Sequence, residues 1–378
     1  MLGVRCSTFG LYILPVYLPC CFCYTYFTMA LNILSPLSGP DEVERLIEAG
    51  AGEFYCGILP DKWRRDYSVA ASINRRQEDN RKQGVSPHMS TFYELERCVE
   101  LARPHNVNVT ITLNEHFYSN SQYPALTTYI EQCLKSGANT FIVGDIGMIL
   151  TLQDIDPNVN IHISTAGTAF NSESVHFYRD MGARRVILPR HLTLDEIQAI
   201  ADKADGIELE AFILNSRCAN IDGFCTFQHG LTEFIDDPEK TKDYANACMM
   251  INKISADVKG CDSPEQAESM LEKVSWERQH FWSAVHIDDR PCGACALYEL
   301  ENMGLAGVKI VGRANTFEKK IKDVRFLQEL LVYLRTQKPT KKEFREKARE
   351  TYKDIYDCVC LIFKCYYPSV MLDEDTGC

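Results

Sequence analysis

Short apolar runs that alternate with amphipathic helical segments constrain the fold of this chain most. Each run is partly β-branched, as expected of strands that are buried on both faces of a parallel sheet. We predict eight strands, at Asn32–Ser35, Glu53–Gly57, Asn108–Leu113, Thr140–Gly144, Asn160–Ser164, Arg185–Leu188, Ile207–Ile213 and Val308–Val311. Helices are expected between them at Asp41–Ala49, Thr91–Ala102, Tyr123–Ser136, Ser172–Met181 and Thr193–Ala201.

This alternation predicts an α/β fold, a (β/α)8 barrel of the TIM type with a long cysteine-rich insertion after strand seven. Thr193 and Glu196 have the spacing of a capping box, and Gly137 and Gly182 end two of the helices. In such a barrel the chemistry lies on the loops that follow the strands, at the carboxyl-terminal rim.

The first part of the chain is treated separately, because no charged residue occurs from Cys6 to Pro40. The segment is either an upstream extension or a marginal membrane anchor. Pro15 and Pro19 interrupt it, so we favour the extension and expect no stable membrane association. We assign residues 1–28 to this extension, 29–337 to the barrel and 338–378 to a C-terminal helix with a cysteine-containing tail.

Charge and cysteine content bound the class of protein. The net charge of −12 argues against general coating of nucleic acid, although a local basic patch can still bind RNA. The 17 cysteines are spread along a chain of 378 residues and do not resemble a secreted disulfide scaffold. We therefore expect a cytoplasmic protein in which some cysteines hold a metal or a cluster.

Two expected loops on the rim are long, residues 58–89 and residues 214–296. The first carries several basic residues, which suit RNA or an anionic substrate or simply form a solvated loop. We single out Arg64, Arg65, Arg75, Arg76, Arg81 and Lys82. The second contains Cys218, Cys225, Cys248, Cys261, Cys292 and Cys295. Thiolates at these short spacings suit a [4Fe–4S] cluster or zinc, the alternative being inert buried thiols.

Several polar residues near strand ends are candidates for substrate contact. Arg190 and Arg313 follow strands six and eight, where they either bind an anion or form salt bridges on the rim. Asn114 and Thr165 follow strands three and five and either bind substrate or cap turns. His162, Glu208 and Glu210 lie within strands, so they are catalytic candidates only if they face the barrel interior. A lone interior histidine is more often a satisfied core residue, and glutamates that face away from the interior pair with neighbouring arginines.

Two segments carry a resemblance to a known family. IELEAFILNSRCANIDGFC and LYELENMGLAGVKIVGR resemble the cysteine-bearing strand and the final strand of the collagenase-like peptidase family U32. Weaker matches extend the resemblance over residues 30–315. Val311 stands where the family motif KIEGR has glutamate, while Lys309 and Arg313 match it and are expected to contact substrate.

The resemblance implies an oxygen-independent hydroxylase that carries a [4Fe–4S] cluster and modifies an RNA base or a small aromatic ring. It also implies prephenate as the oxygen source. The implied cluster ligands are Cys218, Cys225, Cys248 and Cys292, with Cys295 competing for the last position. The electron donor is not indicated by the sequence.

Two alternatives remain open at this stage. One is the activity in the family's name, a collagenase-like metal-dependent peptidase, although the chain has no HExxH or GxSxG motif. The other is a non-catalytic RNA-binding protein in which zinc staples the long loop.

Overall fold

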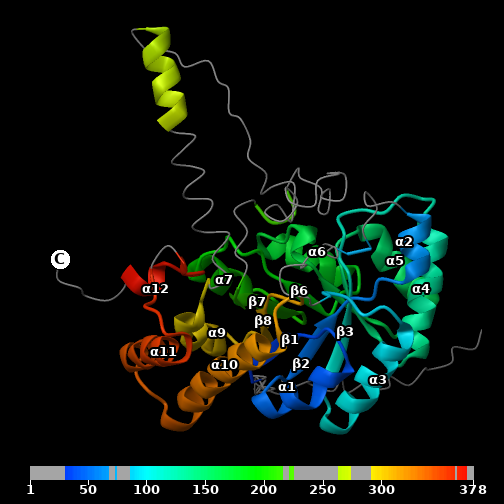
Figure 1. Ribbon diagram of the computed structural model, residues 1–378, viewed down its shortest axis with the longest axis horizontal. Helices are drawn as coiled ribbons and strands as arrows, with labels where there is room; N and C mark the ends of the chain where they lie inside the picture. The colour runs from blue at the N-terminus through cyan, green and yellow to red at the C-terminus, as the bar shows by residue number, and fades with distance from the viewer. Residues whose placement is uncertain are drawn as a thin grey trace, which may run out of the picture.

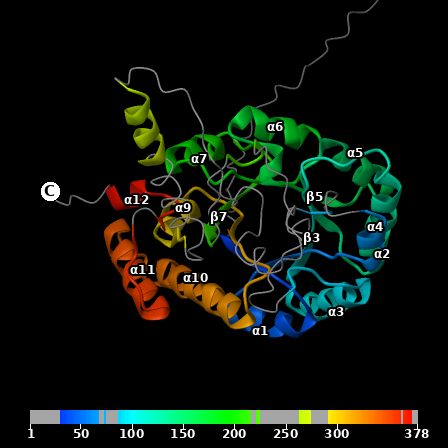
Figure 2. The same ribbon diagram turned by 45° about the horizontal axis from the view of Figure 1, so that its top comes forward.

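The computed structural model describes residues 30–67, 73–74, 86–215, 221–224, 263–273, 291–361 and 364–372. Eight parallel strands close into a barrel in chain order, and helices surround it (Figures 1 and 2). The strands are β1 Asn32–Pro36, β2 Glu53–Cys56, β3 Asn108–Leu113, β4 Thr140–Val143, β5 Asn160–Ile163, β6 Arg185–Ile187, β7 Glu208–Leu214 and β8 Gly307–Ile310. The predicted fold is confirmed, with each strand boundary within one residue of its expected place.

The five predicted helices are also present, at α1 Val43–Ala49, α3 Phe92–Ala102, α4 Tyr123–Lys135, α6 Ser172–Asp180 and α7 Leu194–Ala201. The capping box at Thr193 and Glu196 is formed. One barrel helix, α5 Ile146–Ile155, was not predicted from the sequence because its apolar residues are not confined to one face. The short α2, Asp61–Asp66, was not predicted either.

Residues 264–273 form a helix within the second long loop. After that loop come α9 Leu297–Asn302, α10 Phe317–Gln337, α11 Lys341–Tyr356 and α12 Ser369–Leu372. The expected surface helix beyond residue 338 corresponds to α11, which begins after a capping box formed by Thr340 and Glu343. Helix α10 packs against α1 and α11. None of the helices that the structure describes is both long enough and apolar enough to span a membrane.

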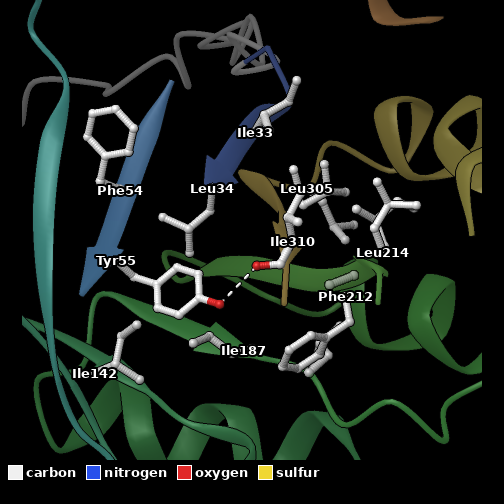
Figure 3. Packing of buried hydrophobic residues seen from close by; sticks show 14 of the residues in the cluster. Ile33, Leu34, Phe54, Tyr55, Ile142, Ile187, Phe212, Leu214, Leu305 and Ile310 are labelled. Atoms are coloured by element: carbon white, nitrogen blue, oxygen red, sulfur yellow. Dashed lines mark hydrogen bonds between the residues drawn. The ribbon is translucent and has the colours of Figure 1, made fainter. Parts of the chain in front are cut away.

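The barrel interior is only partly apolar. In Figure 3 the side chains of Leu34, Tyr55, Ile142, Ile187 and Phe212 come from five different strands, and the Tyr55 hydroxyl donates a hydrogen bond to the Ile310 carbonyl over 2.9 Å. Buried charged side chains accompany them inside the closed barrel. These charges, and the loops above them, position the candidate site.

Candidate functional site

Near the amino-terminal ends of the strands, the barrel holds an arginine surrounded by carboxylates. Arg185, at the start of β6, lies 2.7 Å from Glu53, 2.7 Å from Glu208 and 3.1 Å from Glu210. Glu210 is fully buried and also lies 3.6 Å from Lys309. The two glutamates therefore lie on the interior face and are also paired with Arg185, while their acid–base role stays a prediction.

His162 belongs to a pocket at the opposite end from the rim. This pocket, of about 380 Å³, is lined by residues at the amino-terminal ends of the strands, among them Asn32, Glu53, Asn108 and Arg185. Burial, helped by the nearby Arg185, holds the pKa of His162 well below its ordinary value, so the imidazole is neutral. Its Nδ1 has no hydrogen-bond partner among the described residues. His162 faces the interior as predicted, but it lies at the amino-terminal end.

Lys309 occupies the middle of the barrel. Its side chain is buried, and its Nζ lies 4.2 Å above the centre of the Tyr55 ring. Burial lowers the pKa of Lys309 to about 8, with Arg313 acting in the same direction and Glu210 opposing it. This buried amine therefore loses its proton more readily than an ordinary lysine does.

Arg313 forms a cluster on the rim with residues from the first long loop. Its guanidinium donates to Thr112 at the end of β3 and to the Asn74 side chain, each over 2.9 Å. Gly57 follows β2 and permits the close approach, because a Cβ there would lie 2.2 Å from Arg313 Nη1 and 2.9 Å from His88 Nδ1. The cluster thus contains Arg313, Thr112, Asn74, Gly57 and His88.

Contacts with the barrel hold the first long loop, residues 58–89, so that Asn74 and His88 lie beside Arg313. Tyr118 donates from its hydroxyl to the Ile73 carbonyl over 2.6 Å, and Ile58 pairs with Met89 at the base of the loop. Asn74 and His88 were missed by sequence reasoning, which considered only the basic residues of this loop. Of the six predicted basic residues, the Arg65 side chain is described and exposed. The side chains of Arg64, Arg75, Arg76, Arg81 and Lys82 lie outside the described residues.

Arg190 forms an ion pair on the rim. Asp222, in the segment between Cys218 and Cys225, accepts hydrogen bonds from the backbone N–H of Arg190 over 2.9 Å and from its Nε over 3.0 Å. The guanidinium also stacks 4.9 Å from the centre of the Phe212 ring. The salt-bridge interpretation therefore applies to Arg190, and Asp222 is a partner that sequence reasoning missed.

The loop after β5 supports the same segment. Ser164 caps the short helix η3, Thr165–Gly167, by accepting from the Ala166 N–H. Gly223 adopts a φ of +80°, and a Cβ there would lie 2.9 Å from the Thr165 carbonyl oxygen. Thr165 thus lies beside the cysteine-bearing segment, and Asn114 follows β3 as a half-buried residue on the same rim.

The predicted metal ligands are described only in part. Cys218, Cys225 and Cys248 lie outside the described residues, whereas Cys292 and Cys295 are buried beside the end of β7. Burial raises the pKa of Cys295 to about 12 and that of Cys292 well above its ordinary value. No group of three potential ligands is placed to hold a metal within the described ranges. Two neighbouring buried sulfur donors fit one side of a cluster or zinc site.

The C-terminal tail covers this cysteine segment. Residue Cys292 pairs with Leu214 on one side and with Cys365 on the other. Its N–H donates to the Lys364 carbonyl and its carbonyl accepts from the Tyr366 N–H, both over 3.0 Å. The Tyr367 hydroxyl then donates to the Phe212 carbonyl over 2.9 Å. The tail therefore forms part of the rim and places Cys365 next to Cys292.

The family model of peptidase family U32 matches residues 40–367. Among curated proteins, the "tRNA hydroxylation protein P" of Haemophilus influenzae is 27% identical over 194 residues, which are 51% of this chain and 38% of that protein. The "23S rRNA 5-hydroxycytidine C2501 synthase" of Escherichia coli is 31% identical over 143 residues, 38% of this chain and 21% of that protein. The chain thus spans well under half the length of these relatives.

A solved structure described as the U32 peptidase Mk0906 is also similar. It has a TM-score of 0.40 and 12% sequence identity, and the match covers 75% of this chain and 93% of that one. The barrel assignment does not depend on it, because the closed strand order is established by the pairing of the strands themselves.

Proposed function

The chain belongs to peptidase family U32, and we propose on this basis that it supports hydroxylation of an RNA base in the cytoplasm. The relatives named for tRNA and rRNA hydroxylation support this choice over peptide cleavage. The observation that carries the proposal is the convergence of both long loops on one rim. Asn74 reaches Arg313 from the first loop, and Asp222 reaches Arg190 from the second.

A redox centre at this rim is part of the proposal. Cys218, Cys225, Cys248 and Cys292 would hold a [4Fe–4S] cluster, with Cys295 as the competing fourth ligand and zinc as the alternative metal. When bound, such a cluster supplies one-electron transfer. The described thiols are compatible with it, because Cys292 and Cys295 bring adjacent sulfur donors to the end of β7.

The chain's own residues would bind and orient the substrates. Arg313 is held by Thr112 and Asn74, so its charge is fixed on the rim, where a phosphate or a carboxylate of a prephenate-like oxygen donor would meet it. Lys309 lies deeper, with a pKa of about 8, and can gain or lose a proton near neutral pH. Glu210, 3.6 Å away, is the group that would exchange that proton.

The test combines metal analysis with nucleoside mass spectrometry. The protein is purified without oxygen, and iron, sulfide and zinc are measured. Modified nucleosides are then compared between cells that lack the gene and cells that express the wild-type or the Arg313→Gln chain. We expect iron and sulfide in equal amounts, and a hydroxylated nucleoside that the variant fails to restore. Zinc without iron, together with peptide cleavage that chelation abolishes, would overturn the proposal in favour of a peptidase.

A further inference from the structure

Two buried lysines in this barrel have very different surroundings. Lys320, in α10, has its Nζ 2.6 Å from Ser38 Oγ and 2.9 Å from both carboxylate oxygens of Glu42. Lys309 has a carboxylate oxygen of Glu210 at 3.6 Å, which is beyond ordinary hydrogen-bond length, and an aromatic ring face. Lys320 thus has three short polar contacts, whereas Lys309 has one longer ion pair, with Glu210.

The position of Lys309 within the barrel suits a reacting group. It is the third residue of β8, paired with Leu34 of β1 and Phe212 of β7, and its side chain contacts the Tyr55 ring in the interior (Figure 3 shows Leu34, Phe212 and Tyr55). Arg313 follows the same strand on the rim. The side chain is 7% exposed, so only a small molecule could react with it.

We propose that Lys309 is a nucleophilic lysine that forms a reversible imine with a small carbonyl compound carrying a carboxylate. This goes beyond the proposed RNA reaction and does not depend on it. A lysine that is desolvated and lies near another cation is activated for attack on carbonyl groups. Arg313, on the rim side of Lys309, supplies the charge that would attract the carboxylate.

The reaction balances without an oxidant or a reductant. The neutral amine of Lys309 attacks the carbonyl carbon, a C–N bond forms, and the carbonyl oxygen leaves as water after taking up two protons. Those protons balance the two that the amine nitrogen gives up. Oε1 of Glu210 has no hydrogen-bond partner among the described residues and faces Nζ, so it is placed to carry them.

The charged groups around Lys309 set its titration. Glu210 on β7 favours the protonated form, while Arg313 after β8 and Arg185 on β6 oppose it. His162 on β5 is neutral, and the Tyr55 hydroxyl on β2 is engaged with the Ile310 carbonyl. With a pKa of about 8, Lys309 holds on the order of 100-fold more neutral amine at pH 7 than an ordinary lysine does.

Reductive trapping tests this directly on the full chain. The protein is incubated at pH 7 with pyruvate and sodium cyanoborohydride, and the fraction of each lysine that carries a carboxyethyl group is measured by peptide mass spectrometry. We expect Lys309 to be modified roughly tenfold or more above exposed lysines such as Lys203, and Lys320 to be unmodified. Equal modification of Lys309 and exposed lysines, or none on Lys309, would overturn the inference.

Two variants sharpen the result. Lys309→Arg should lose the adduct at this position, with folding checked by circular dichroism. Arg313→Gln removes a cation that lowers the pKa of Lys309, so trapping of acetone, which has no carboxylate, should fall to some extent and trapping of pyruvate should fall further; an equal loss for both would contradict carboxylate binding by Arg313. An adduct on Lys309 without any hydroxylated nucleoside would count against the proposed function alone, and the reverse result would count against Lys309 alone.

Discussion

Arg190 and Asp222 join the loop after β6 to the cysteine-bearing segment through a buried ion pair, with 2.9 Å from the Arg190 N–H and 3.0 Å from its Nε to the same carboxylate oxygen. The Asp222 side chain is fully buried and the Arg190 side chain is 11% exposed. Asp222 lies between Cys218 and Cys225 in sequence, and this pair holds it against the loop after β6. The ion pair thus has a positioning role on the rim.

Replacing Asp222 should therefore be costly. Asp222→Ala leaves the Arg190 guanidinium buried without its carboxylate, and we expect a loss of about 3 kcal/mol in the free energy of unfolding. Urea unfolding followed by circular dichroism measures it. The matched control is Asp180→Ala, which removes an exposed pair with Arg179 and should cost less than about 1 kcal/mol. Similar losses for the two variants would contradict a special role for Asp222.

Gly57 provides a test of the Arg313 cluster. A Cβ at Gly57 would lie 2.2 Å from Arg313 Nη1, so Gly57→Ala should displace the guanidinium from Asn74 and Thr112. We expect RNA hydroxylation in cells to fall at least tenfold, as for loss of an oriented charged contact. The control is Gly39→Ala, where no atom lies within 4 Å of the new Cβ. Unchanged hydroxylation in the Gly57 variant would show that Arg313 is not needed there.

Strand placement was predictable from the sequence because local periodicity decides it. Buried parallel strands need continuous apolar runs, and strands such as β3, Asn108–Leu113, are short and bounded by turn signals. Helix α5 was not predicted, because its apolar residues are not restricted to one face and give no helical periodicity, although Asp145 caps it. A periodicity argument cannot detect a helix of that composition.

The partners of the site residues were not predictable for a different reason. Arg190 and Arg313 were found by their place after strands, but their partners Asp222 and Asn74 come from long loops far away in sequence. Loop closure brings these residues together through tertiary contacts such as the Tyr118–Ile73 hydrogen bond, which leave no periodic signal. The position of a residue after a strand predicts that it lies on the rim. Which residue it pairs with there can be seen only in the folded structure.

His162 predicts a specific acid dependence of stability. Burial holds its folded-state pKa well below the unfolded value of about 6.5, so the unfolded chain binds the proton first. The stability contributed by the neutral imidazole is therefore present above pH 6.5 and is lost as the pH falls below it, by up to about 1.4 kcal/mol per pH unit. His162→Gln should flatten this part of the profile in urea unfolding measured from pH 7 to pH 5. Parallel profiles for the two chains would refute the assignment.

The tail predicts a measurable protection of Cys292. Tyr367→Phe removes the hydrogen bond to the Phe212 carbonyl, which should cost about 1 kcal/mol and loosen the pairing of Cys365 with Cys292. Local opening then exposes the Cys292 thiol, so its alkylation by iodoacetamide should accelerate about fivefold. Cys133, buried in α4 away from the tail, serves as the internal control and should react at the same slow rate in both chains. If Cys292 and Cys133 accelerate together, the variant has lost global stability, and the tail is not a local cover of the cysteine segment.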